Sequence, residues 1–429
     1  MACILSVVLV GVVSACADPP LRYDFRVGSH LIYDYRVRVG PLDSQQISER
    51  YSEQIQLWVL ERSGYRAMLI GECARVDQTG LGPARGVTLR IDARGNRELP
   101  AELQREESVF RPLLWLLPGL PPAFDSGQQW DTPIDARGIR LRCRRAGADA
   151  QRGGAQRIEF VADDTLGVWA LLGIELRGTY WFDTDAGRVV RLEYERVDRT
   201  HGRLQRVVAR LYEQRQVTQQ WCRLRLPLVE KHLFTIRLEQ HLRERIGNEP
   251  ELAEQIVDAM QRVWTERLRE LSRGKAVPFE RWVAGRRRLV RANRERFMQQ
   301  ARIAAEWMSG RQALQERAGA DEPRATLLYY FDPAGEDDLR GLAELAGEAA
   351  ALSQRGWRVV AVVVPSKREQ AARCLERLAP QLEWRLGGAA LPAGASPVYR
   401  ALDGDGRTNR VHFGWWPRRV AELAAQSPE

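Results

Sequence analysis

ATLLYYFDPAGEDDLRGLAEL, residues 325–345, is the stretch that decides the fold of the C-terminal part of this chain. Residues 326–331 form a short apolar run typical of a buried strand, and a turn containing proline and glycine follows it. A helix is expected over residues 339–345. GWRVVAVVV, residues 356–364, is a second apolar run rich in β-branched residues, as in a strand covered on both faces. The stretch therefore predicts an α/β domain that begins with strand, turn and helix.

The same domain closes with SPVYRALDGDGRTNRVHFGW, residues 396–415. A Ser-Pro pair leads into a strand, an Asp-Gly pair makes a tight turn, and a second strand returns. This order of elements resembles the thiol-disulfide oxidoreductase and peroxiredoxin branch of the thioredoxin-like superfamily, over about a quarter of the chain. The resemblance implies a sheet with flanking helices. It also places Pro397 at the family's cis-proline beside the active site, after a loop close to Gly335.

The chemistry of that family needs cysteines that this stretch lacks. In thioredoxin-like proteins a Cys-x-x-Cys pair stands at the start of the first helix, where the helix dipole lowers the thiol pKa. The resemblance places these two positions at Gly335 and Asp338, and neither side chain can attack a disulfide. The turn over residues 332–338 also contains no cysteine for a peroxiredoxin. We therefore expect a degenerate redox site, with no catalytic residue and no cofactor.

The first twenty residues, MACILSVVLVGVVSACADPP, have the pattern of an export signal. Residues 4–13 form an apolar run of signal-peptide length that is too short to span a bilayer. Residues 13–16, VSAC, resemble a bacterial lipobox, in which Cys16 becomes the lipidated first residue of the mature protein. The alternative is cleavage after Ala17, because Ala15 and Ala17 also fit the small-x-small rule. Both alternatives predict export to the cell envelope or periplasm, and the first also predicts a lipid anchor.

Export bears on the cysteines, since disulfides form in oxidising compartments. Four of the six cysteines lie beyond the leader, at positions 73, 143, 222 and 374. They have no metal-ligand spacing, and the five histidines form no catalytic motif, so no metal site is predicted. A disulfide between Cys73 and Cys143 is one possibility, and burial as free thiols is the other. Cys374 lies in a helical pattern beside an apolar side and is interpreted as a core residue.

The charge composition does not identify a partner. The chain has 429 residues and a net charge of +9, but only three of its 65 basic residues are lysine. Such an arginine bias reflects coding composition more often than binding chemistry. No zinc-finger or RNA-binding pattern accompanies the charge, so nucleic acid is not an expected partner. The length fits two or three domains of ordinary globular composition.

The N-terminal half has the periodicity of β-strands. From residue 21 to about 217, runs such as HLIYDYRVRV and EQIQLWVL alternate apolar and polar side chains, which predicts an antiparallel sheet with one wet face. The clearest hairpin is YWFDTDAGRVVRLEYE, residues 180–195. Residues 112–122, PLLWLLPGLPP, are apolar and punctuated by proline. They are expected either to plug the sheet as a short helix or loop, or to line a lipophilic groove. The meander resembles exported half-barrel proteins that carry or sense lipids.

The period becomes helical after residue 222. Asn248-Glu249-Pro250 is a helix start, residues 274–278 form a break, and one long helix is expected from 280 to about 316. Residues 281–302 contain eight arginines and one acid, a local excess of +7. The excess predicts either a solvated helix face or contact with anionic lipid head groups near a membrane held by Cys16. The candidate lipid contacts are Arg286, Arg287, Arg288, Arg291 and Arg294.

Taken together, these patterns predict a multidomain protein. After a leader over residues 1–17, we expect an antiparallel β-sheet domain (18–222), an α-helical arginine-rich segment (223–319) and a C-terminal thioredoxin-like α/β domain (320–429). The expected function is binding or envelope organisation at a membrane surface. The groove beside Pro397 can hold an extended peptide by main-chain pairing, and a lipid is the other ligand considered. The alternative is a thiol-disulfide oxidoreductase or peroxidase that uses Cys374 or a cysteine of the β domain. The position of the thiols relative to the turn at 332–338 and to Pro397 separates the two.

Overall fold

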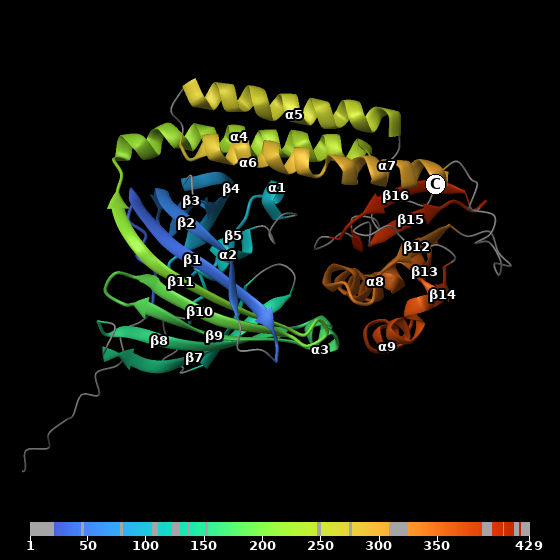
Figure 1. Cartoon of the computed structure of the whole chain (residues 1–429), viewed down its shortest axis with the longest axis horizontal. Helices are drawn as coiled ribbons and strands as arrows, with labels where there is room; N and C mark the ends of the chain where they lie inside the picture. The colour runs from blue at the N-terminus through green and yellow to red at the C-terminus, as the bar shows by residue number, and fades with distance from the viewer. Residues whose placement is uncertain are drawn as a thin grey trace, which may run out of the picture.

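Two sheets and a layer of long helices make up the protein (Figure 1). The computed structural model describes residues 21–43, 47–77, 80–104, 110–121, 129–134, 138–150, 153–246, 250–273, 277–308, 325–387, 397–405, 407–415 and 420–421. Cys16 and the rest of the leader lie outside the described residues. Among the described residues, no helix combines the length and the apolarity needed to cross a membrane.

The first sheet has 11 antiparallel strands in the order β5-β4-β3-β2-β1-β11-β10-β9-β8-β7-β6. Two meanders, β1 to β5 and β6 to β11, are therefore joined by the pairing of β1 with β11. The strands are β1 (Ser29–Pro41), β2 (Ser48–Ser63), β3 (Arg66–Asp77), β4 (Gly80–Asp92), β5 (Arg97–Glu98), β6 (Gln129–Pro133), β7 (Ile139–Asp149), β8 (Ala155–Asp164), β9 (Ile174–Asp183), β10 (Arg188–Asp198) and β11 (Arg203–Gln216). The prediction of a large antiparallel sheet is confirmed.

The inner face of this sheet is filled by its own side chains and by three short helices, α1 (Ala101–Gln104), α2 (Arg111–Trp115) and α3 (Val168–Leu172). Leu113 and Trp115 of α2 are buried. Gly71 of β3 leaves the space that Leu113 occupies, because an added Cβ would overlap that leucine. The described part of the proline-punctuated segment is thus a short helix that plugs the sheet, the first of the two structures expected for it.

Four long helices follow: α4 (Gln219–Ile246), α5 (Pro250–Arg273), α6 (Phe279–Ala292) and α7 (Arg294–Met308). The prediction of one helix from residue 280 to about 316 is wrong, because the chain turns at Asn293, whose side-chain amide donates to Leu289 O at 2.9 Å. Helix α6 packs on β4, where Gly86 makes room for the Trp282 ring. Helix α7 instead packs on the second sheet, so the two helices serve different sheets.

The second sheet has five strands in the order β14-β13-β12-β15-β16. Strands β12 (Thr326–Tyr330), β13 (Arg358–Val363) and β14 (Glu383–Leu386) are parallel, whereas β15 (Val398–Leu402) and β16 (Thr408–Phe413) are antiparallel. Helices α8 (Glu336–Gln354) and α9 (Arg368–Leu378) and a single 3-10 turn (Pro365–Lys367) complete this part. The prediction of a sheet with flanking helices after residue 324 is confirmed.

The two faces of the second sheet have different covers. Tyr329 of β12 belongs to the same core as Leu339 and Leu342 of α8. Its neighbour Tyr330 points the other way and packs on Trp307 of α7, with 5.0 Å between the ring centroids. One layer of the C-terminal unit therefore comes from a helix that precedes residue 320.

Candidate functional site

The two positions that the sequence assigned to a lost redox pair lie at the start of α8. Gly335 is the N-cap residue and is in extended conformation (φ −87°, ψ 124°). Asp338 is 5% exposed, and its Oδ1 accepts a hydrogen bond from the backbone N–H of Asp332 at 2.7 Å. A side chain at position 335 would clash with the Asp338 carboxylate. The carboxylate thus holds the turn of its own chain closed.

Pro397, the third residue of the expected site, is buried at the start of β15. Its carbonyl accepts a hydrogen bond from Gly414 N at 2.8 Å, so that carbonyl is paired within the sheet region. Ser396, which forms the peptide bond before it, lies outside the described residues.

A cluster of charged and aromatic side chains joins the start of α8 to the β domain. We call the set Asp164, Trp169, Arg196, Glu336 and Arg340 the junction cluster. Glu336 Oε1 accepts from Trp169 Nε1 at 3.0 Å and pairs with Arg340 at 3.1 Å, while its Oε2 pairs with Arg196 at 3.3 Å. Trp169 lies on α3, and Arg196 lies on β10. The first turn of α8 therefore faces the 11-stranded sheet.

The centre of the junction cluster is a fully buried ion pair. The side chains of Arg340 and Asp164 are 0% and 1% exposed, and Arg340 Nη1 lies 3.2 Å from Asp164 Oδ1. The other Asp164 oxygen accepts from Trp169 N at 2.9 Å. Burial by itself would raise the pKa of Glu336, but the positive charges of Arg111, Arg340 and Arg196 outweigh it and lower that pKa to about 2. Glu336 therefore stays ionised and acts as a fixed anion between the two units.

Cys374 of α9 lies beside the turn that precedes α8. Its Sγ is 3.9 Å from the carbonyl oxygen of Pro333. The side chain is 4% exposed, and burial raises the pKa of the thiol despite the nearby Arg373. A thiol must ionise before it attacks, so this environment disfavours chemistry at Cys374. One condition for an enzyme, a cysteine near the turn, is met, and the condition of a stabilised thiolate is not.

The other described cysteines are also buried and free. The possible disulfide between Cys73 and Cys143 is not formed, because these residues lie on β3 and β7, strands on opposite sides of the β1–β11 pairing. Burial raises the pKa of each of these two thiols to about 12. Among the described residues, no group of three or more His, Cys, Asp and Glu side chains could hold a metal ion.

The five arginines proposed to contact lipid do not form one exposed surface. Arg286 is mostly buried and pairs with Glu239 of α4 at 2.8 Å. Arg294 pairs with Asp258 of α5 at 3.1 Å and also with Glu254. Arg287 is half-buried, whereas Arg288 and Arg291 are exposed on α6. Acids from distant parts of the chain thus neutralise much of the excess that is local in the sequence.

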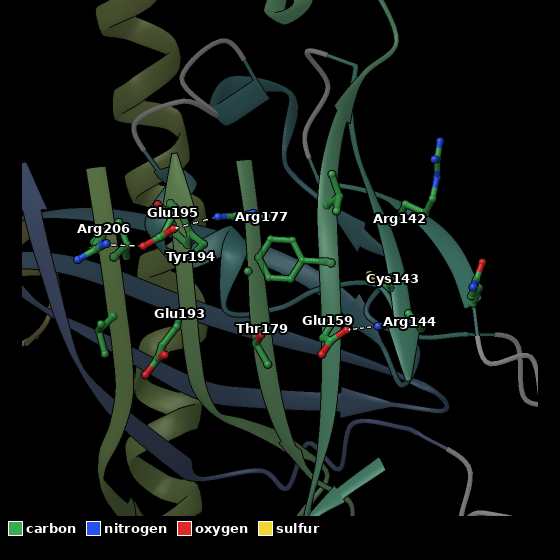
Figure 2. Close-up of a pocket in the computed structure, with 16 residues that line it drawn as sticks. Arg142, Cys143, Arg144, Glu159, Arg177, Thr179, Glu193, Tyr194, Glu195 and Arg206 are labelled. Atoms are coloured by element: carbon green, nitrogen blue, oxygen red, sulfur yellow. Dashed lines mark hydrogen bonds and ion pairs between the residues drawn. The ribbon is translucent and has the colours of Figure 1, made fainter. Parts of the chain in front are cut away.

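A groove with a volume of about 610 Å³ crosses strands β7 to β11 (Figure 2). Charged side chains on neighbouring strands form ion pairs along it, with Arg144 and Glu159 at 2.5 Å and Arg206 and Glu195 at 2.6 Å. Arg177 approaches Glu195 from the other side at 3.7 Å. Exposed pairs of this kind contribute only about 0–1 kcal/mol each, so a ligand can replace them at small cost. We call this surface the sheet groove.

Two uncharged side chains also line the sheet groove. Val161 of β8 is 57% exposed and Thr179 of β9 is half-buried, whereas Gly178 faces the other side of the sheet, toward Phe160. A Cβ at Gly178 would meet Phe160 and the backbone of β10, so the glycine is required by close packing. A second hollow of about 650 Å³ shares Val161 with the groove and extends it along the same sheet. The surface therefore offers a channel lined by side chains of both charges, with Val161 as an exposed apolar residue.

Sequence reasoning missed both the junction cluster and the sheet groove. The spacing of Glu336 and Arg340, four residues apart on a helix, was a visible signal for one ion pair. Nothing in the sequence connects either residue to Asp164 or Trp169, because those contacts bridge more than 160 positions. The groove likewise arises from cross-strand neighbours that become adjacent only in the folded sheet.

Comparison with family models and with curated proteins finds no match. Among solved structures, the chain is similar to a putative thiol:disulfide interchange protein DsbE from Chlorobium tepidum, at 15% identity over 24% of this chain and 79% of that one, with a TM-score of 0.22. It is also similar to the thioredoxin domain of a thiol-disulfide oxidoreductase from Bacteroides vulgatus, at 10% identity over 24% and 81% of the two chains, with a TM-score of 0.21. A third similarity, to lipovitellin, covers 77% of this chain and 44% of that chain at 10% identity, with a TM-score of 0.31. At these scores the similarities assign the chain to no family.

Proposed function

We propose that this protein is a non-enzymatic binding protein of the cell envelope, exported and held at a membrane by lipid on Cys16. Its C-terminal unit has a thioredoxin-like fold that performs no thiol chemistry. The proposed domains are the β domain over residues 18–222, the helical segment over 223–319 and the thioredoxin-like unit over 320–429.

The observation that carries this proposal is the state of the start of α8. On the proposed thioredoxin-like fold, a glycine and a buried carboxylate would occupy the two sulfur positions, and Glu336 and Arg340 connect the same helix turn to the β domain. Disulfide exchange needs an accessible thiolate at this place. The same residues are well suited to fix one unit against the other, because they combine buried charge with several hydrogen bonds.

The sheet groove is the proposed binding site. Its paired arginines and glutamates suit an extended peptide better than an acyl chain, because both signs of charge are present along one channel. A peptide with alternating charges can exchange its own ion pairs for Arg144–Glu159 and Arg177–Glu195 without leaving a charge unpaired.

The test of the proposal is a pair of assays on the full chain. Insulin reduction and hydroperoxide turnover should both stay at background, and Cys374→Ser should change neither rate. In the native host, Cys16→Ser should move the protein from the membrane fraction to the soluble fraction. Retention of the serine variant in the membrane fraction would remove the lipid anchor from the proposal.

The second candidate function is a thiol oxidoreductase or peroxidase that uses Cys374. The 3.9 Å distance between its Sγ and Pro333 O is the observation in favour. Turnover above background that disappears in Cys374→Ser would establish this function in place of the first.

A further inference from the structure

Strands β2 and β4 hold a buried carboxylate that belongs neither to the junction cluster nor to the sheet groove. Glu53 of β2 is 2% exposed. Its Oε1 accepts a hydrogen bond from Arg85 Nη2 of β4 at 2.5 Å. Its Oε2 is also buried, and among the described residues this oxygen has no hydrogen-bond partner. A buried carboxylate oxygen without a donor is costly, so Oε2 favours a ligand that donates to it.

Arg75 of β3 is a cation without an acid beside the same carboxylate. The strand register places Arg75 directly opposite Glu53. Its guanidinium instead lies over the ring of Tyr51, with 5.2 Å between Cζ and the ring centroid. No carboxylate of the described residues forms an ion pair with Arg75. An acceptor without a donor and a cation without an acid therefore lie on neighbouring strands.

This group of side chains reaches the surface. We call Tyr51, Glu53, Arg75 and Arg85 the β2–β4 cluster. Arg75 is exposed, the side chain of Arg85 is 40% exposed, and Tyr51 is half-buried. Glu53 is therefore a buried acid beside two cations that solvent reaches. Two arginines and one carboxylate leave the cluster with an excess of positive charge, which favours an anion.

The titratable groups around Glu53 leave it as the acid that can change its protonation on binding. Burial raises the pKa of Glu53 and outweighs the two arginines of the cluster, which lower it. Tyr35 of β1 lies opposite Glu53, and its hydroxyl is hydrogen-bonded to that of Tyr194 at 3.0 Å. Arg111 of α2 acts on Tyr194 from the other side. Cys73 of β3 stays a neutral thiol, because burial raises its pKa to about 12.

We propose that the β2–β4 cluster binds a small oxyanion, either a carboxylate or a phosphate, which shares one proton with Glu53. Arg75 and Arg85 donate to the anion. The proton comes from the solvent and lies between an oxygen of the anion and Oε2 of Glu53. Without it, two negative charges would meet in a buried site. The cluster lies on other strands than the sheet groove, so this site does not depend on the proposed peptide.

The experiment is isothermal titration calorimetry of the purified full chain with sodium acetate and, separately, with inorganic phosphate. Chloride keeps the ionic strength constant, so that general screening does not change. At least one of the anions should bind, and the one with the higher affinity identifies carboxylate or phosphate chemistry. Buffers with different enthalpies of ionisation measure proton uptake, which should accompany acetate binding. The affinity for acetate should fall by up to about tenfold per pH unit above the pKa of Glu53.

The variants separate the charge of the site from its proton. Arg75→Gln should weaken binding by about tenfold or more, and Arg75→Lys should recover part of the loss, because the charge returns. Glu53→Gln should still bind, because its amide N–H donates to the anion, but proton uptake by the protein and the pH dependence should disappear. Arg75 is exposed, so its variants should melt with the parent.

Arg90→Gln is the matched control, because Arg90 is an exposed arginine on β4 that pairs in register with Glu98 at the other end of the strand. It should leave the affinity for both anions unchanged. The proposal is overturned by absence of binding of both anions, or by equal affinity in Arg75→Gln. It is also overturned by an equal loss in Arg90→Gln, which would indicate attraction by net charge alone, or by unchanged proton uptake in Glu53→Gln.

Discussion

Arg340→Met is the perturbation that tests the junction cluster most directly. Methionine keeps most of the length and apolar stem of arginine but removes the charge. It leaves the Asp164 carboxylate, which is 1% exposed, without its ionic partner in a site that is closed to water. Removing one partner of a buried ion pair costs about 3–5 kcal/mol, because the remaining charge is buried and uncompensated.

Two features determine where the loss of stability should lie within that range. Asp164 keeps hydrogen bonds from the backbone N–H groups of Trp169 and Leu166, at 2.9 Å and 3.2 Å, which favours the lower end. Glu336 also loses one of its cations, although Arg196 at 3.3 Å remains. We therefore expect a loss of about 3 kcal/mol, which lowers the melting temperature of a unit of about 150–250 residues by about 6–12 °C.

The assay is scanning calorimetry of the full chain with hydrogen exchange at α8. Arg377→Met, on the exposed side of α9, is the matched control and should change stability by less than about 0.5 kcal/mol. The double variant Asp164→Asn with Arg340→Met should recover part of the loss, because the amide oxygen can still accept from Trp169 N. A melting curve for Arg340→Met that matches the parent, or a double variant less stable than the single one, would refute the argument.

Three further predictions concern other parts of the molecule. His232 is buried among aromatic rings, and burial and the charges of Arg286 and Arg267 lower its pKa to about 3. The unfolded state therefore binds more protons between pH 6.5 and about 3, and stability should fall by up to about 1.4 kcal/mol per pH unit as the pH drops through that window. His232→Phe should flatten this dependence in unfolding titrations, and an unchanged slope would count against it. Trp307→Ala should destabilise the second sheet by about 3–5 kcal/mol in denaturant unfolding, because the indole fills the face that α7 covers. Because α7 covers one face of the second sheet, a chain that starts at residue 320 should be insoluble, whereas a chain that starts at residue 294 should fold. Equal solubility of the two chains would contradict the role of α7. Gly86→Ala should displace α6, because the added Cβ would overlap the Trp282 ring, and unchanged tryptophan fluorescence would argue against the close approach.

The alternation of side chains was enough to predict the large sheet, although the expected wet face is kept only in part: it is present along β7, whereas α4 and α6 cover β2 and β4. Strands β1 to β4 and β8 to β11 all show the alternation, and their register follows from simple meanders. Strands β5 and β6 were missed because they have two and five residues, and Pro133 ends the second. Strand β7 alternates arginine with apolar residues, and its pairing with β8 shifts register between Arg145 and Ala148.

Helix boundaries and domain boundaries were less accessible to sequence reasoning. The apolar spacing continues through Asn293, so nothing local requires the break that the structure has there. The break follows from two distant surfaces, Gly86 on one sheet and Tyr330 on the other, which bind successive parts of the segment. For the same reason residue 320 is a boundary in composition, while the packing that completes the second sheet starts at α7.

In the arginine-rich segment and in α4, the surface of the folded protein differs from the surface that the sequence pattern suggests. The run of arginines looks like a patch because its charges are consecutive, but Glu72, Glu239 and Asp258 approach it from β3, α4 and α5. Helix α4 looks like an ordinary core helix because its apolar residues are numerous, although only one face of it can reach the sheet. Acids from other elements neutralise part of the charge of the arginine-rich segment. Apolar side chains of α4 remain exposed on the face that contacts no other described element. The surface charge of a helix therefore follows from the partners that the fold brings to it, and a run of like charges in the sequence does not by itself predict a membrane contact.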